Sequence, residues 1–186
     1  MAALAGQSFV IPEDGGVFTA ALACHIASGL TCVVTGALAA TASKRPGRHT
    51  AAGTIYIWSL AVVFASATVM ALLRLAEDWH LLLIAVIAFT SGSLGYLARR
   101  RRWRGWLWVH LLGMSSSYIA LLTGFYVDNG PNLPLWNRLP TVAFWLLPSL
   151  VGIPLVLRAM ARRRRSLFRP PAGGRRHSGP APGRPG

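Results

Sequence analysis

An uncharged and strongly apolar stretch occupies residues 50–73, TAAGTIYIWSLAVVFASATVMALL. A helix needs about 20 mostly apolar residues to cross the hydrocarbon core of a bilayer, and this stretch is long enough. Further apolar stretches lie at residues 17–42, 80–98, 106–127 and 141–160. The sequence therefore predicts an all-α fold, an integral membrane bundle of about five transmembrane helices.

Two of the predicted helices depart from this simple pattern. The stretch at 80–98 is short and near the lower limit for spanning. The stretch at 141–160 is interrupted by Pro148 and Pro154. Proline removes a backbone donor and kinks a helix, although membrane helices tolerate it where neighbours satisfy the freed carbonyls. We therefore expect the fifth helix to be the least regular.

The composition excludes an ordinary soluble enzyme. Hydrophobic residues make up 53% of the 186 residues and charged residues only 13%, yet the formal net charge is +14. A soluble domain has roughly 25% charged residues. A basic domain that binds nucleic acid would spread its charge over a folded polar face, whereas here the charges form short clusters between apolar runs. The composition indicates a membrane protein and no nucleic-acid partner.

The clusters of charge predict the orientation of the chain. All but two of the 19 Lys and Arg residues lie between the first and second helices, between the third and fourth, or in and beside the C-terminal tail. The exceptions, Arg74 and Arg138, lie on the other side with all 5 acidic residues. Since cytoplasmic loops carry an excess of Lys and Arg, we predict an outer N-terminus and a cytoplasmic C-terminus. The Arg clusters would then contact the anionic lipids of the cytoplasmic leaflet.

Three regions follow from this topology. Residues 1–16 form an extracytoplasmic N-terminal segment, and residues 17–160 form the transmembrane bundle. Residues 161–186 are rich in Pro, Gly and Arg and cannot bury enough apolar surface to fold alone. We therefore expect a disordered basic cytoplasmic tail.

Four histidines on or beside successive predicted helices are the candidate cofactor ligands. They are His25, His49, His80 and His110. Because the helices alternate in direction, His25 and His80 fall in the outer half of the membrane, and His49 and His110 fall in the inner half. This arrangement is typical of b-type membrane cytochromes, which hold a haem near each face between histidines of two helices. A neutral imidazole is a good axial ligand to haem iron, and a polar residue inside a membrane bundle tends to be functional.

The depths of the four histidines fit this hypothesis unequally. With a rise of 1.5 Å per residue, His25 and His80 differ in membrane depth by about 6 Å. His49 and His110 differ by about 9 Å. A tilted haem could bridge the first difference in depth more easily than the second. One alternative to a haem ligand is therefore that His49 lies among the lipid headgroups and binds nothing. A second alternative makes the histidines interhelical hydrogen-bond donors with no ligand. No nucleotide loop, zinc motif or nucleophile motif is present, so we predict no catalytic residue.

Two segments resemble a family of bacterial predicted membrane proteins, domain-of-unknown-function family 2306. The front half is carried by His25-xxx-Gly29 and by RHTAAGTIY at residues 48–56. The back half is carried by HLLGMSSSYIALLTGFYVDNG at residues 110–130, then LPLW at 133–136 and WLLP at 145–148. The resemblance covers roughly residues 23–157. It implies a bacterial multi-helix membrane protein with His25, His49 and His110 at patterned positions, His80 less clearly so, and it implies no established activity.

Three functions remain open from the sequence. The leading hypothesis is a small b-type-haem protein of the bacterial cytoplasmic membrane that transfers electrons. The first alternative is a proton-coupled transporter in which His25 and His110 titrate in a polar cavity. The second is a non-catalytic partner or assembly factor of a larger membrane complex, with protein partners or a second copy of the chain. In the loop after the fourth helix, Asp128 and Asn129 are turn formers or, alternatively, a polar lid over the outer half.

Overall fold

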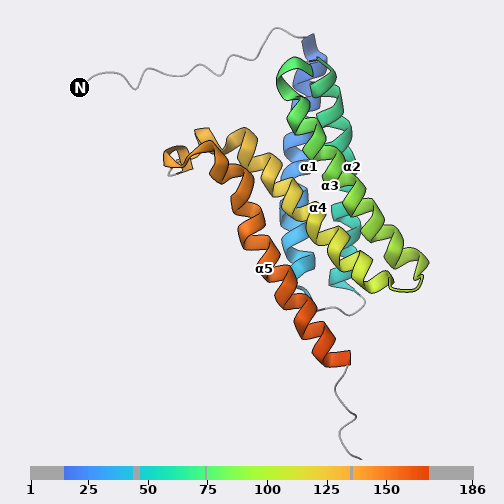
Figure 1. The fold of residues 1–186 in the computed structure, drawn as a ribbon. Coiled ribbons are helices and arrows are strands. Elements are labelled where there is room, and N and C mark those ends of the chain that lie inside the picture. Colours follow the sequence, from blue (N-terminus) through green and yellow to red (C-terminus); the bar gives the residue numbers. More distant parts are fainter. Residues whose placement is uncertain (1–14, 44–46, 74, 135, 168–186) are drawn as a thin grey trace, which may run out of the picture.

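The computed structural model describes residues 15–43, 47–73, 75–134 and 136–167, and within these ranges the protein is all helical. The long helices are α1 (Gly15–Thr41), α2 (Arg48–Leu73), α3 (Leu75–Arg101), α4 (Trp106–Asn129) and α5 (Thr141–Leu167). Two short 3-10 turns, η1 (Gly130–Asn132) and η2 (Trp136–Arg138), join α4 to α5. Successive long helices run in alternating directions through the bundle (Figure 1).

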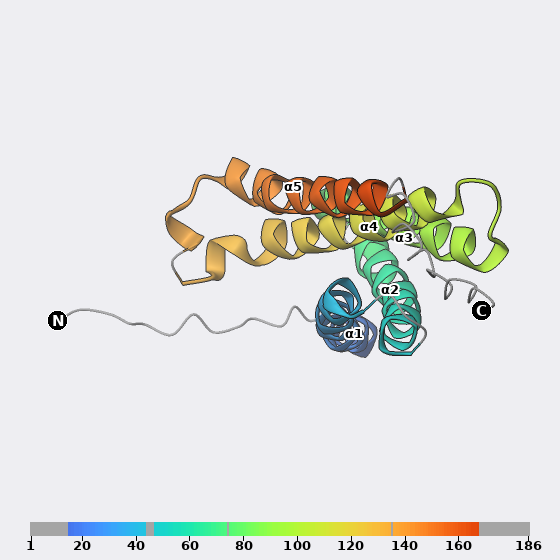
Figure 2. The same ribbon diagram turned by 90° about the horizontal axis from the view of Figure 1, so that it is seen from below.

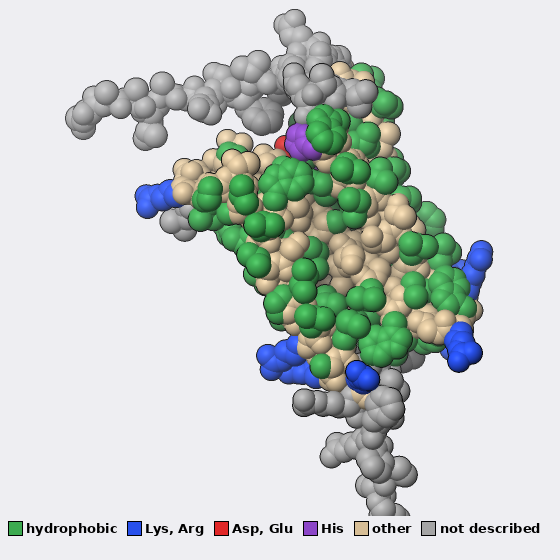
Figure 3. Space-filling view, in the orientation of Figure 1, with side chains coloured by type: hydrophobic (Ala, Val, Ile, Leu, Met, Phe, Trp, Pro, Cys, Tyr) green, Lys and Arg blue, Asp and Glu red, His purple; other side chains and the backbone are tan. Residues whose placement is uncertain are grey.

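The predicted membrane architecture is confirmed at the level of the helices. In the part of the chain that the structure describes, 5 helices are long and apolar enough to cross a membrane. Large apolar side chains such as Leu30, Trp58 and Leu150 are more than 60% exposed on their outer surfaces. Figure 3 shows apolar side chains spread over the face of the bundle in view. A soluble protein rarely exposes so extensive an apolar surface, so these side chains are suited to contact lipid.

The expectation about the length of the third helix was wrong, and two helices extend beyond their apolar runs. The third helix is not short, because α3 runs for 27 residues from Leu75 to Arg101. The fifth helix, α5, continues through Pro148 and Pro154 and ends at Leu167, so both prolines lie inside it. Charged residues such as Arg and Glu are good helix formers, so a helix backbone extends past the end of its apolar run. The predicted N-terminal segment lies outside the described residues except for its last two residues, as does the tail beyond Leu167.

The bundle consists of two helical hairpins and one further helix. The antiparallel partners α1 and α2 pack along each other, as do α3 and α4, while α2 contacts α3 and α5 contacts α4 (Figure 2). Glycines permit the closest of these contacts. A Cβ atom at Gly113 would lie 2.6 Å from the Ser91 carbonyl oxygen, and one at Gly95 would lie 2.8 Å from the Met114 nitrogen. Small residues let the backbones of membrane helices approach closely, and here they set the spacing of α3 and α4.

The two hairpins meet in a buried core near the middle of α2 and α4. Its largest fully buried side chains are Tyr56, Leu60, Cys32 and Ser117. The hydroxyl groups of Tyr56 and Ser117 share a hydrogen bond of 2.8 Å. The Tyr118 hydroxyl donates to the Val33 carbonyl of α1 at 3.0 Å. Because the bilayer offers no water to these groups, such bonds fix how the hairpins are placed relative to each other.

Cationic side chains gather at one end of the bundle. This end contains the start of α2, the connection from α3 to α4 and the end of α5 (Figure 1). Its described cations are Arg48, Arg99, Arg100, Arg101, Arg102, Arg104, Arg158, Arg162 and Arg164. The connection between α4 and α5, which includes η2 with Arg138, lies at the opposite end (Figure 1). We call the end with the nine listed arginines the cationic end.

The close α3–α4 contact is tested by Gly113→Ala. The added methyl group meets backbone atoms of Ser91 and Gly95, so the helices must separate and lose packing. We expect the free energy of unfolding to fall by about 1–3 kcal/mol, measured by denaturation in detergent.

Gly29→Ala is the matched control, because a Cβ atom there has nothing within 4 Å. Its expected effect is neutral, or a gain of up to about 1 kcal/mol from helix propensity. Equal destabilisation by both substitutions would contradict the close contact.

Candidate functional site

Two of the four predicted ligand histidines lie side by side at the cationic end. The ring centroids of His49, in the first turn of α2, and His110, near the start of α4, are 6.2 Å apart. Their planes are almost perpendicular, at 88°. Both side chains are half-buried. We call these two residues the inner histidine pair.

A backbone carbonyl orients each ring of this pair. The Nδ1 atom of His49 is 2.8 Å from the Ala39 carbonyl oxygen in α1, and that of His110 is 2.9 Å from the Gly95 carbonyl oxygen in α3. A carbonyl oxygen only accepts hydrogen bonds, so Nδ1 is the donor in both rings. In the neutral imidazole the lone pair is then on Nε2. Metal-binding histidines commonly have this arrangement, in which a carbonyl fixes the tautomer and the orientation of the ring.

The pair comes together where α2 and α4, which run in the same direction, cross obliquely (Figure 1). His49 and His110 are 61 positions apart in the sequence, and so are Tyr56 and Ser117. Seven residues make nearly two helical turns, so both contacts use the same faces of α2 and α4. The 9 Å difference in depth expected from upright helices does not keep the rings apart, because α4 runs obliquely to α1 and α2 (Figure 1). His49 is also inside α2, which starts at Arg48 and not at residue 50.

Further side chains surround the inner histidine pair. The Arg99 guanidinium of α3 donates to the Thr50 hydroxyl at 2.8 Å. The Trp106 ring centroid is 6.4 Å from that of His110, and the Arg102 guanidinium lies over Trp106 at 5.9 Å. One turn from His49, a Cβ atom at Gly53 would have nothing within 4 Å. The surroundings thus combine cationic groups, an aromatic ring and open space beside α2.

The two outer histidines have separate surroundings. His25 of α1 is hydrogen-bonded through Nδ1 to the Ser66 hydroxyl of α2 at 3.1 Å. His80 of α3 contacts the rings of Trp79 and Trp145, with centroids 6.1 and 6.2 Å away. The structure therefore gives the inner pair a direct ring contact and places His25 and His80 against different helices.

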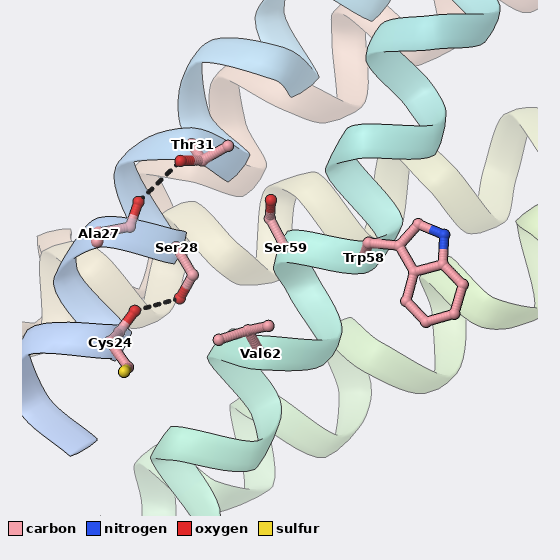
Figure 4. A pocket seen from close by; sticks show the side chains of 7 residues that line it. All are labelled: Cys24, Ala27, Ser28, Thr31, Trp58, Ser59 and Val62. Carbon is pink, nitrogen blue, oxygen red and sulfur yellow. Dashed lines mark hydrogen bonds between the residues drawn. The ribbon is translucent and has the colours of Figure 1, made fainter. Parts of the chain in front are cut away.

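A shallow hollow elsewhere on the bundle does not reach these histidines. It lies between α1 and α2 and is lined by Cys24, Ala27, Ser28, Thr31, Trp58, Ser59 and Val62 (Figure 4). The Ser28 and Thr31 hydroxyls donate to carbonyls of their own helix at 2.6 and 2.8 Å. The Trp58 ring points away from the other lining residues (Figure 4). With these hydroxyls already bonded, the hollow offers little to a polar ligand.

Two parts of this site were missed by reasoning from the sequence. One is Tyr56, whose hydroxyl meets Ser117. The sequence does hold a signal for this contact: Tyr56 follows His49 by seven residues, and Ser117 follows His110 by the same number. The other is the bond between Arg99 and Thr50, for which the sequence holds no signal, because it joins different helices.

Comparison of the chain with protein-family models, with curated proteins and with solved structures finds no match. The resemblance to family 2306 stays a prediction.

The tautomer of the inner histidine pair can be tested by nitrogen-15 NMR of histidine-labelled protein in detergent, assigned with His49→Asn and His110→Asn. We expect both rings to carry the neutral-state proton on Nδ1, because each Nδ1 donates to a carbonyl. His80, which the structure places against indole rings, is the internal reference. Protonation on Nε2 in His49 and His110 would contradict the assigned hydrogen bonds.

Proposed function

We propose that this chain is a membrane redox protein that binds one b-type haem through His49 and His110 and carries electrons at its cationic end. The observation that supports this function is the geometry of the inner histidine pair. Two imidazoles that hold one metal ion from opposite sides each place a nitrogen about 2 Å from it, which puts their centroids about 6 Å apart. The two rings are 6.2 Å apart with both Nδ1 atoms engaged by carbonyls.

The number of protein ligands favours haem over a bare metal ion. Among the described residues, no group of three or more His, Cys, Asp or Glu side chains is placed to hold a metal ion. Zinc sites take three or four protein ligands. Haem iron takes only its two axial ligands from the protein, and neutral imidazoles are suited to that role. When bound, haem supplies a one-electron redox centre.

The proposal includes one haem and not two. The contact that supports it exists for His49 and His110, whereas His25 bonds to Ser66 and His80 packs against Trp79 and Trp145. Electron transfer would therefore take place near one membrane face. Inside the proposed site, the Ala39 and Gly95 carbonyls hold the rings, and the Trp106 ring lies beside His110.

The proposed orientation places this site at the cytoplasmic face of a bacterial cytoplasmic membrane. The support is the segregation of charge, since nine described arginines lie at the cationic end and Arg138 lies at the other. Cytoplasmic loops carry the positive excess, and each Arg near an anionic leaflet adds about 1 kcal/mol of attraction. The inner histidine pair would then exchange electrons with a partner on the cytoplasmic side.

The ligand assignment is tested by the reduced-minus-oxidised spectrum of protein purified from haem-replete cells. We expect b-type bands in the wild type and their loss in His49→Ala and in His110→Ala, because each substitution removes one axial ligand. His80→Ala is the matched control and should keep the bands. A colourless wild-type protein would contradict the proposed function. Loss of the bands in His80→Ala alone would show that the haem is bound at the outer histidines and not at the inner histidine pair.

The space beside the inner histidine pair is tested by Gly53→Leu. Gly53 and Gly29 each lie four residues after a histidine, and a Cβ atom at either has nothing within 4 Å. If the open space at Gly53 receives part of the haem, the leucine side chain excludes it and haem content falls several-fold. Gly29→Leu, beside His25, should leave haem content unchanged. Pyridine haemochrome assays measure this, and equal haem content in both variants would place the macrocycle elsewhere.

A further inference from the structure

Arg99 lies at the meeting point of the contacts that orient the inner histidine pair. It follows Gly95 by one turn of α3, and the Gly95 carbonyl accepts the hydrogen bond from His110. Its guanidinium donates to Thr50, which follows His49 in α2. One half-buried cation of α3 thus bonds to α2 beside His49 and lies one helical turn from the carbonyl that orients His110.

The Thr50 bond fixes Arg99 without using most of its donors. A guanidinium has five N–H donors in a planar fork, and the Thr50 hydroxyl accepts from one nitrogen, Nη2. A half-buried cation in a membrane protein usually pairs with an opposite charge or with backbone carbonyls. An arginine fork matches the two oxygens of a carboxylate, and such charge-assisted bonds are about twice as strong as neutral ones.

We infer that Arg99 binds a carboxylate of the ligand held by the inner histidine pair, which for the proposed haem is a propionate. This inference rests on the proposed function. It gives the haem a direction, with at least one propionate on the Arg99 side of the rings, toward the cationic end. Thr50 is a positioning residue, because it holds the guanidinium through Nη2 beside His49.

The test compares the affinity of the full-length protein in detergent for haem and for its dimethyl ester, in which both carboxylates are blocked. Affinity is measured by haem transfer to a soluble apo-globin. We expect the wild type to bind the ester about tenfold to a hundredfold more weakly than haem, because a hydrogen bond to a charged group is lost. Arg99→Gln should weaken haem binding by a similar factor and should leave ester binding unchanged.

Arg104→Gln is the matched control. It removes the same charge from an exposed position in the α3–α4 connection and should change neither affinity. Thr50→Val is a second variant, which frees the guanidinium and should weaken haem binding less than Arg99→Gln does. Since the ester comparison in the wild type needs no substitution, the inference stays testable if Arg99→Gln fails to fold.

The outcomes separate the inference from the proposed function. A wild-type protein that binds neither haem nor its ester overturns both. A wild type that binds haem and ester equally, or an Arg99→Gln protein with wild-type haem affinity, overturns the role of Arg99 alone. If Arg99→Gln and Arg104→Gln lose haem affinity equally, the loss reflects the total positive charge and not a bond from Arg99. That result also overturns the role of Arg99.

Discussion

The structure depends on the crossing of α2 and α4, where side chains of the two helices form a polar seam. Two polar contacts occur along this seam at the same sequence offset, Tyr56 with Ser117 and His49 with His110. In a bilayer, polar side chains find no water, so each needs a partner in the protein. A shift of one residue along either helix would separate both pairs. The seam therefore fixes the arrangement of the bundle and the geometry of the candidate site together.

Small residues and backbone carbonyl groups also contribute to the geometry of the candidate site. Gly95 and Gly113 let α3 and α4 approach closely, and the Gly95 carbonyl is the group that orients His110. The Ala39 carbonyl near the end of α1 does the same for His49. Each ring is thus held by a helix other than its own. Such support from neighbouring elements is what a metal-binding histidine requires to keep its lone pair in place.

The sequence predicts the helices well and the contacts between them poorly. The five apolar runs gave the all-α fold and the approximate spans, because bilayer thickness fixes the length of an apolar helix. The ends of α3 and α5 were missed, since helix backbones continue into charged residues. Depths reckoned from upright helices fitted His25 with His80 better than His49 with His110, whereas the family resemblance included His49 and His110 and left His80 less clear. An apolar run specifies length but not tilt, and the oblique course of α4 brings the inner rings together (Figure 1).

In the proposed function, His49 and His110 bind one haem iron. The most direct measurement is low-temperature EPR of the oxidised, purified protein. Because the two imidazole planes are 88° apart, we expect a low-spin ferric signal of the highly anisotropic type that perpendicular imidazole ligands produce. A high-spin signal, a low-spin signal typical of parallel imidazoles, or the absence of iron would contradict it.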